Sequence, residues 1–103
     1  MSEVKTINGR EYTFKKYGLQ ESVDIKNRSL EIDIETQSPR VLTGTMQALT
    51  ILHSIENGLK DKDGKEIPHT LPNLYTYFPP EDFDEAFNIA AKMNGLSGEE
   101  KNA

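Results

Sequence analysis

The 103-residue chain contains no cysteine. It therefore has no disulfide framework, no thiolate nucleophile and no cysteine-bound zinc. It also has no run of basic residues and a formal net charge of -5, whereas binding of nucleic acid needs a cationic footprint. No stretch approaches the ~20 apolar residues of a membrane span, and the N-terminus lacks the apolar core of a signal segment. We therefore expect a cytoplasmic protein that binds neither nucleic acid nor membrane.

Apolar residues are scarce as well. Hydrophobic residues make up 35% of the chain and charged residues 28%, which is a low apolar share for a self-sufficient core. The length suits one domain, and no shift in composition divides the chain. A partner or a homo-oligomer that covers apolar surface would fit this composition, and so would a marginally stable monomer. We predict a single domain over residues 1–95 and a polar, disordered tail over residues 96–103.

Residues 4–16 carry the pattern of a β-hairpin. Asn8 and Gly9 separate two short runs, and both residues tolerate the positive φ of a type I′ turn. Apolar and polar residues alternate on either side, and the expected covered face consists of Val4, Thr6, Tyr12 and Phe14. An isolated hairpin is only marginally stable in water. This face must therefore pack against helices.

Residues 19–35 are ambiguous. Four residues fit one helical stripe: Leu19, Val23, Leu30 and Ile34. Two groups alternate with period two instead, as in a strand: Val23 and Ile25, then Leu30, Ile32 and Ile34. We predict a helix over residues 19–29 and leave residues 30–35 open as its continuation or a third strand.

The second helix is predicted from Ser38, a good N-cap, and Pro39, which is pre-set for the first helical position. The apolar residues that follow recur at helical spacing: Leu42, Met46, Leu49, Leu52 and Ile55. Asn57 and Gly58 supply the stop. This helix should be the most buried of the domain.

Residues 60–78 begin as a polar loop and end in the aromatic stretch LYTYF, which should pack across the core. The last helix is predicted to begin at Pro80 and to end at Asn94 and Gly95. Its acidic residues, Glu81, Asp82 and Asp84, suit the positive helix end. The expected fold is α+β and mainly helical, with the N-terminal β-hairpin packed on two or three helices.

No motif for catalysis or for a cofactor is evident. The only histidines, His53 and His69, have no second ligand at metal-binding spacing, and the calcium-loop resemblance of residues 61–66 fails at two ligand positions. No G-x-S-x-G nucleophile motif occurs. We therefore predict a protein that is not an enzyme and has no cofactor or metal. Aromatic residues near the C-terminus are then the candidate partner-binding surface, although core is their more frequent role: Tyr75, Tyr77, Phe83 and Phe87.

The layout over residues 4–95 resembles the small tail assembly chaperones of long-tailed bacteriophages and prophages, particularly those of Gram-positive hosts. The resemblance lies in the order of the hairpin INGREYTF, a polar first helix, an apolar second helix ending near LHSIENG, an acidic helix PPEDFDEAFNIAAKMNG and a polar tail. It implies a non-enzymatic protein that binds the tape measure protein and helps the tail tube protein to assemble around it. The alternatives are a small structural or completion protein of a phage head or tail, and a generic bacterial protein-binding domain.

Members of that family often exist also in a longer form, which is made by programmed ribosomal frameshifting near the end of the short form. Residues 100–102 can be encoded GAA-AAA-AAC, which contains the slippery string A-AAA-AAC. The resemblance therefore implies a possible frameshift position at Lys101 and Asn102. An ordinary solvated tail is the other interpretation of these residues.

Overall fold

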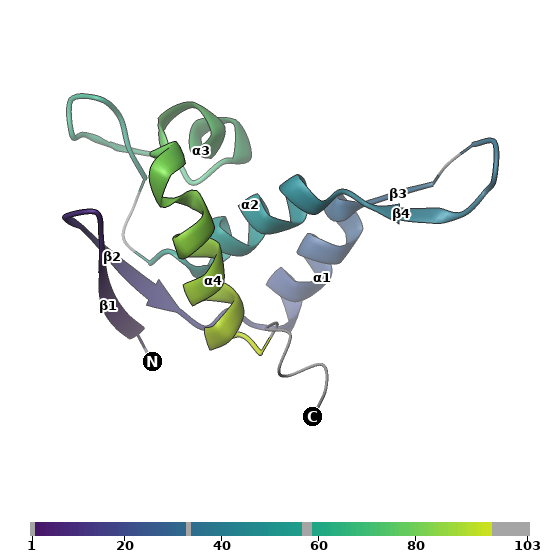
Figure 1. The fold of residues 1–103 in the computed structure, drawn as a ribbon, viewed down its shortest axis with the longest axis horizontal. Helices are drawn as coiled ribbons and strands as arrows, with labels where there is room; N and C mark the ends of the chain where they lie inside the picture. Colours follow the sequence, from purple (N-terminus) through teal and green to yellow (C-terminus); the bar gives the residue numbers. More distant parts are fainter. Residues whose placement is uncertain (1, 33, 57–58, 96–103) are drawn as a thin grey trace.

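Four α-helices and three two-stranded antiparallel ribbons form the part of the chain that this computed structural model describes, residues 2–32, 34–56 and 59–95 (Figure 1). In chain order the elements are β1 (Ser2–Ile7), β2 (Arg10–Lys15), α1 (Leu19–Ser29), β3 (Leu30–Ile32), β4 (Pro39–Val41), α2 (Thr43–Ser54), β5 (Leu59–Lys60), β6 (Glu66–Ile67), α3 (Leu71–Tyr77), the short 3₁₀ turn η1 (Pro80–Asp82) and α4 (Phe83–Met93). The predicted α+β class, with a hairpin followed by helices, is confirmed. The predicted tail lies outside the described residues.

Helix α2 lies at the centre of the fold and contacts α1, α3 and α4 (Figure 1). It is the most buried helix, as the sequence predicts, and its buried residues are Ala48, Leu49, Thr50, Ile51, Leu52 and Ser54. Residues 48–52 are buried without interruption, so neighbouring elements surround this part of α2, whereas the start of its first turn is exposed. The hairpin and the other three helices complete the core with Ile7, Phe14, Ile25, Leu74, Ala86 and Ala90.

The N-terminal hairpin has the turn that its sequence predicts. Asn8 has a φ of 51° and Gly9 a φ of 82°, so both turn residues adopt the positive φ of a type I′ loop. The loop places Ile7 opposite Arg10 and thereby sets the register of the two strands.

The predicted covered face of the hairpin is wrong in its first strand. Opposite residues have numbers that add up to 17, so even-numbered residues of β2 share a face with odd-numbered residues of β1. The buried face therefore joins Tyr12 and Phe14 to Ile7, which is 1% exposed. Val4 and Thr6 lie on the opposite face, and Val4 is 61% exposed. The prediction followed the alternation within each strand but did not apply the register that the turn sets between the two strands.

Helix α1 has the predicted bounds, and the open segment after it forms a strand over its first part, β3. The predicted apolar stripe is not a packing face, because its residues are all exposed: Leu19, Val23, Leu30 and Ile34. Helix α1 buries Ile25 and Ser29 instead. Several apolar residues that the pattern assigns to the interior therefore lie at the surface.

Strands β3 and β4 form a ribbon that projects away from the helices (Figure 1). We call the described residues of the segment 30–41 the arm. Its opposite residues are Leu30 and Val41, Glu31 and Arg40, and Ile32 and Pro39. All six are exposed. The arm thus has almost no packing of its own and depends on its base, where the Leu42 N–H donates to the Ser29 carbonyl at 2.6 Å.

The predicted start of the second helix is wrong. Ser38 is not its N-cap, and Pro39 opens β4 rather than the helix, which begins at Thr43. A proline suits this place because an edge strand tolerates a residue without an N–H donor. At the other end α2 stops at Ser54, and the predicted stop at residues 57–58 lies outside the described residues.

Residues 60–78 contain more regular structure than the sequence predicts. Strands β5 and β6 form a short ribbon, and helix α3 occupies the aromatic stretch. Thr70 caps α3, because its hydroxyl accepts the N–H of Asn73 at 3.3 Å. Leu74 and Phe78 are buried, so the expected packing of this segment across the core is confirmed.

The last helix has the predicted bounds, apart from its 3₁₀ entry. Pro80 is the first residue of η1, which continues directly into α4. Asn94 is the C-cap of α4, and Gly95 follows it with a φ of 73°, so the predicted stop is confirmed. Ala86 and Ala90 are fully buried, and α4 contacts α2. Their small side chains allow the two helices to approach closely.

Two buried serine hydroxyls differ in their hydrogen bonds and provide a test of the packing. Ser29 Oγ has no hydrogen-bond partner among the described residues, whereas Ser54 Oγ accepts from Asn94 Nδ2 at 3.1 Å. Ser29→Ala is expected to leave the free energy of unfolding unchanged or to raise it by up to about 1 kcal/mol, because it removes an unsatisfied buried group. Ser54→Ala, the matched control, is expected to lower it by about 1 kcal/mol. Urea unfolding measures both, and a Ser29→Ala protein less stable than Ser54→Ala would contradict this packing.

Candidate functional site

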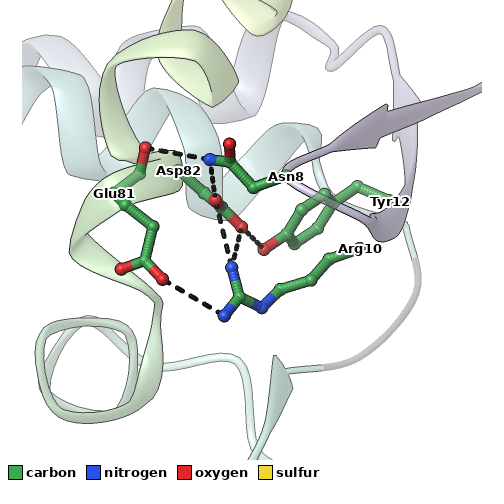
Figure 2. Close-up of polar contacts among 5 residues, drawn as sticks. All are labelled: Asn8, Arg10, Tyr12, Glu81 and Asp82. Carbon is green, nitrogen blue, oxygen red and sulfur yellow. Dashed lines mark hydrogen bonds and ion pairs between the residues drawn. The ribbon is translucent and has the colours of Figure 1, made fainter.

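A buried carboxylate joins the N-terminal hairpin to the start of α4. Asp82 is 0% exposed and accepts hydrogen bonds from Asn8 Nδ2 at 2.7 Å, from the Tyr12 hydroxyl at 2.5 Å and from Arg10 Nη1 at 3.2 Å. Figure 2 shows the three hairpin side chains converging on this carboxylate. At the surface, Arg10 also pairs with Glu81 at 3.1 Å. We call these five residues the Asp82 cluster.

The sequence predicted that Asp82 lies at the start of the last helix, as it does, but did not predict its partners. Asp82 is the N-cap of α4, yet its side chain caps no helix N–H. Its carboxylate is directed at the hairpin instead (Figure 2). The contact joins residues that are 70 or more positions apart, so no local pattern could reveal it.

Burial raises the pKa of Asp82, but the hydrogen bonds from Asn8 and Tyr12 and the charge of Arg10 outweigh it, so the pKa lies below its ordinary value. For Tyr12, burial and the bond to Asp82 raise the pKa. At neutral pH the carboxylate is therefore ionised, and the phenol keeps the proton that it donates. With no exposed surface on Asp82, the cluster is suited to holding the hairpin on α4 rather than to exchanging protons with a bound molecule.

A hollow of about 350 Å³ lies beside the Asp82 cluster. Its lining comes from β2, from the segment around β5 and from the end of α3: Arg10, Glu11, Tyr12, Ile55, Leu59, Lys60, Asp61, Tyr77, Phe78 and Pro79. Apolar groups form most of this lining, and charges of both signs lie among them. Such a hollow suits an apolar side chain of a partner with polar flanks.

A second hollow, of about 320 Å³, is lined by both histidines, although the sequence gave no reason to bring them together. His53 Nε2 lies 2.9 Å from Asp24 Oδ2, and Arg28 binds the same carboxylate at 3.3 Å. The hydrogen bond from His53 is the main cause that lowers the pKa of Asp24, and Arg28 adds to it. This contact links α1 to α2. No group of three or more potential ligands that could hold a metal ion is found among the described residues.

The four predicted partner-binding residues do not form one surface. Tyr75 and Phe83 line a third hollow, of about 320 Å³, together with Leu74, Phe78, Pro80 and Asp84. Tyr77 borders the first hollow instead, and Phe87 is half-buried against the core. Tyr75 is 58% exposed and Tyr77 41% exposed, so these two residues can reach a partner. Lys101 and Asn102, which the sequence analysis named as a possible frameshift position, lie outside the described part of the chain.

The larger exposed apolar surface lies elsewhere, in α1 and the arm. Of the nine large apolar residues that are exposed among those described, six belong to residues 19–41: Leu19, Val23, Leu30, Ile32, Ile34 and Val41. The sequence signal for this surface was the period-two alternation of residues 30–34, which competed with the helical stripe. A strand paired only with one short neighbour has no element to cover its apolar face, and sequence reasoning missed this consequence.

No protein-family model matches the sequence, and comparison with curated proteins and with solved structures likewise found no match. Over the described ranges, no helix has both the length and the apolar character needed to cross a membrane.

Asp82→Asn tests the Asp82 cluster. At pH 7 the substitution is expected to lower the free energy of unfolding by about 2–3 kcal/mol, because it weakens three hydrogen bonds to a buried carboxylate. A lowered pKa means that this stability is present above the ordinary value of 3.8 and is lost as the pH falls through the lowered value. The two proteins should therefore differ most in free energy of unfolding at pH 7, and this difference should shrink below pH 3.8. Urea unfolding at a series of pH values measures it.

Glu81→Gln is the matched control, because Glu81 pairs with the same Arg10 but is exposed. It should change the free energy of unfolding by less than about 0.5 kcal/mol. If both substitutions lowered the free energy of unfolding equally, the buried carboxylate would stabilise the fold no more than the exposed one.

Proposed function

We propose that this chain is a tail assembly chaperone of a long-tailed bacteriophage or prophage of a Gram-positive host. In this proposal it binds the tape measure protein in the host cytoplasm and assists assembly of the tail tube without enzymatic activity. The observation that carries the proposal is the exposed apolar face of the arm. The layout of the sequence supports it independently.

The two faces of the arm differ in chemistry. Leu30 and Val41 lie opposite each other, as do Ile32 and Pro39, so these four side chains share one face. Glu31 and Arg40 form an ion pair on the other face. The apolar face is open, since Ile32 is 67% exposed and Val41 is 54% exposed. A ribbon of this kind has an unoccupied apolar side that can bind the apolar stripe of a helix.

The shape of the molecule suits a long, helical occupant. The arm projects from one end of the fold, so a bound helix can contact it without displacing core elements (Figure 1). Helix α1, which leads directly into the arm, exposes a further apolar residue, Val23, at 44%. The tape measure protein is expected to offer many apolar helical segments, and a chaperone that keeps it in solution needs an apolar surface open to solvent.

Substitution of the apolar face tests this assignment. Ile32→Ser and Val41→Ser are each expected to weaken binding of a tape measure segment about tenfold or more, because each removes an apolar side chain that the partner buries. Stability should change little, since both residues are exposed. Titration calorimetry with purified helical segments of the tape measure protein measures the affinity.

The double substitution Glu31→Gln with Arg40→Gln is the control on the charged face and should leave the affinity unchanged. Tyr75→Ser and Tyr77→Ser test the aromatic residues that the sequence singled out. If the chain binds none of the tape measure segments, the proposal is overturned. Detection of the chain in purified virions would favour a structural component instead.

The gene itself gives a separate test. Codons 100–102 are expected to read A-AAA-AAC across the Lys101 and Asn102 positions, with a long overlapping frame downstream. Mass spectrometry should then find the fused product. A gene that breaks this string and has no overlapping frame would exclude a frameshifting chaperone.

A further inference from the structure

The outer edge of strand β1 is open. Ile7 and Arg10 flank the two-residue turn as opposite residues. In such a turn the N–H of the fourth residue donates to the carbonyl of the first, which makes this a hydrogen-bonded pair. Bonded pairs alternate along an antiparallel ladder, and the odd-numbered residues of β1 therefore bond to β2. The even-numbered residues direct their backbone N–H and C=O groups outward: Ser2, Val4 and Thr6. No other strand of the described chain pairs with this edge.

The opposite edge of the hairpin is already in use. Along β2, the Glu56 N–H donates to the Thr13 carbonyl at 2.7 Å, and Phe14 forms a bridge with Ile55. The hairpin can therefore be extended only at β1. An exposed edge strand of six residues is a template for another strand.

We propose that β1 pairs antiparallel with β1 of a second copy of this chain, on a two-fold axis at Val4. In this register Val4 faces Val4 of the second copy, and Ser2 faces Thr6 of the second copy. All of these residues direct their backbone groups outward, so the ladder of the hairpin continues across the axis. The resulting dimer has one continuous four-stranded sheet.

Charge selects this register. With the axis at Val4, Glu3 lies opposite Lys5 of the second copy, and the symmetry repeats the pair. Both positions are non-hydrogen-bonded, where opposite Cα atoms are only about 4.5 Å apart and side chains are closest. Opposite charges at such positions stabilise a sheet. Within one chain Glu3 and Lys5 form an ion pair at 3.9 Å, and both side chains are about half exposed, so each can exchange this partner for its counterpart in the second copy.

Neighbouring registers are worse. An axis at Lys5 would place Lys5 opposite its own copy, and an axis at Glu3 would oppose two carboxylates. Like charges directly opposite each other destabilise a sheet. If the axis lay between two residues, each residue with outward backbone groups would lie opposite one whose backbone groups already bond to β2. The ladder of hydrogen bonds could then not form.

Single cysteines test the register directly, because the chain has none of its own. Val4→Cys should form a disulfide-linked dimer on mild oxidation, since paired Cα atoms across the axis would lie about 5.5 Å apart, within disulfide range. Thr6→Cys is the matched control: it lies on the same face and edge, but its two copies would be about 14 Å apart along the strand. Equal cross-linking of the two variants, or none at Val4→Cys, would overturn the register.

Charge reversal tests the same pairing without a covalent bond. Glu3→Lys and Lys5→Glu should each weaken the dimer roughly fivefold or more, and the double variant should restore it. Sedimentation velocity measures the dissociation constant, and urea unfolding confirms that each variant folds. A monomer at every concentration overturns the pairing. A dimer that survives both single reversals but is lost with Ile32→Ser also overturns it, since the arm would then be the interface. The first result leaves the proposed binding of the tape measure protein untouched, whereas the second would place another copy of the chain on the face assigned to that protein.

Discussion

The fold depends on one buried carboxylate. The hairpin and α4 are the first and last regular elements among the described residues, and Asp82 joins them through three side chains of the hairpin. A carboxylate without exposed surface is costly unless its oxygens accept hydrogen bonds and a cation lies nearby. Asn8, Arg10 and Tyr12 meet both conditions from a single turn and the strand after it. The type I′ turn thus does more than reverse the chain, because it positions the donors.

Around this anchor the molecule divides its surface into regions of different character. Residues 48–52 of α2 are buried, and the neighbours of α2 complete a small core around them. The arm, in contrast, adds exposed apolar residues and almost no packing. A chain with few apolar residues gains little by leaving them in water. Their place on a projecting ribbon is therefore the main structural argument that another protein covers them.

Local signals in the sequence predicted the elements well. The Asn8–Gly9 turn and the end of α4 follow from turn and cap chemistry. The errors arose where tertiary contacts decide. Pro39 is suited to the first position of a helix, but it lies in β4 and pairs with Ile32 of β3. The candidate site was harder still, since the donors of Asp82 come from the other end of the chain, and the exposure of the arm depends on the absence of a covering element among the described residues.

The separation of the Asp82 contacts affects how the protein folds during synthesis. Asn8 and Asp82 are 74 residues apart, so the hairpin leaves the ribosome long before its anchor is made. Closing a loop of this length carries an entropic cost that local hairpins and helices do not have. The side chains of Asn8, Arg10 and Tyr12 therefore lack their partner until Asp82 has left the ribosome. Docking of the hairpin on Asp82 is therefore a late step of folding, and until it occurs the nascent chain is more exposed to non-native association.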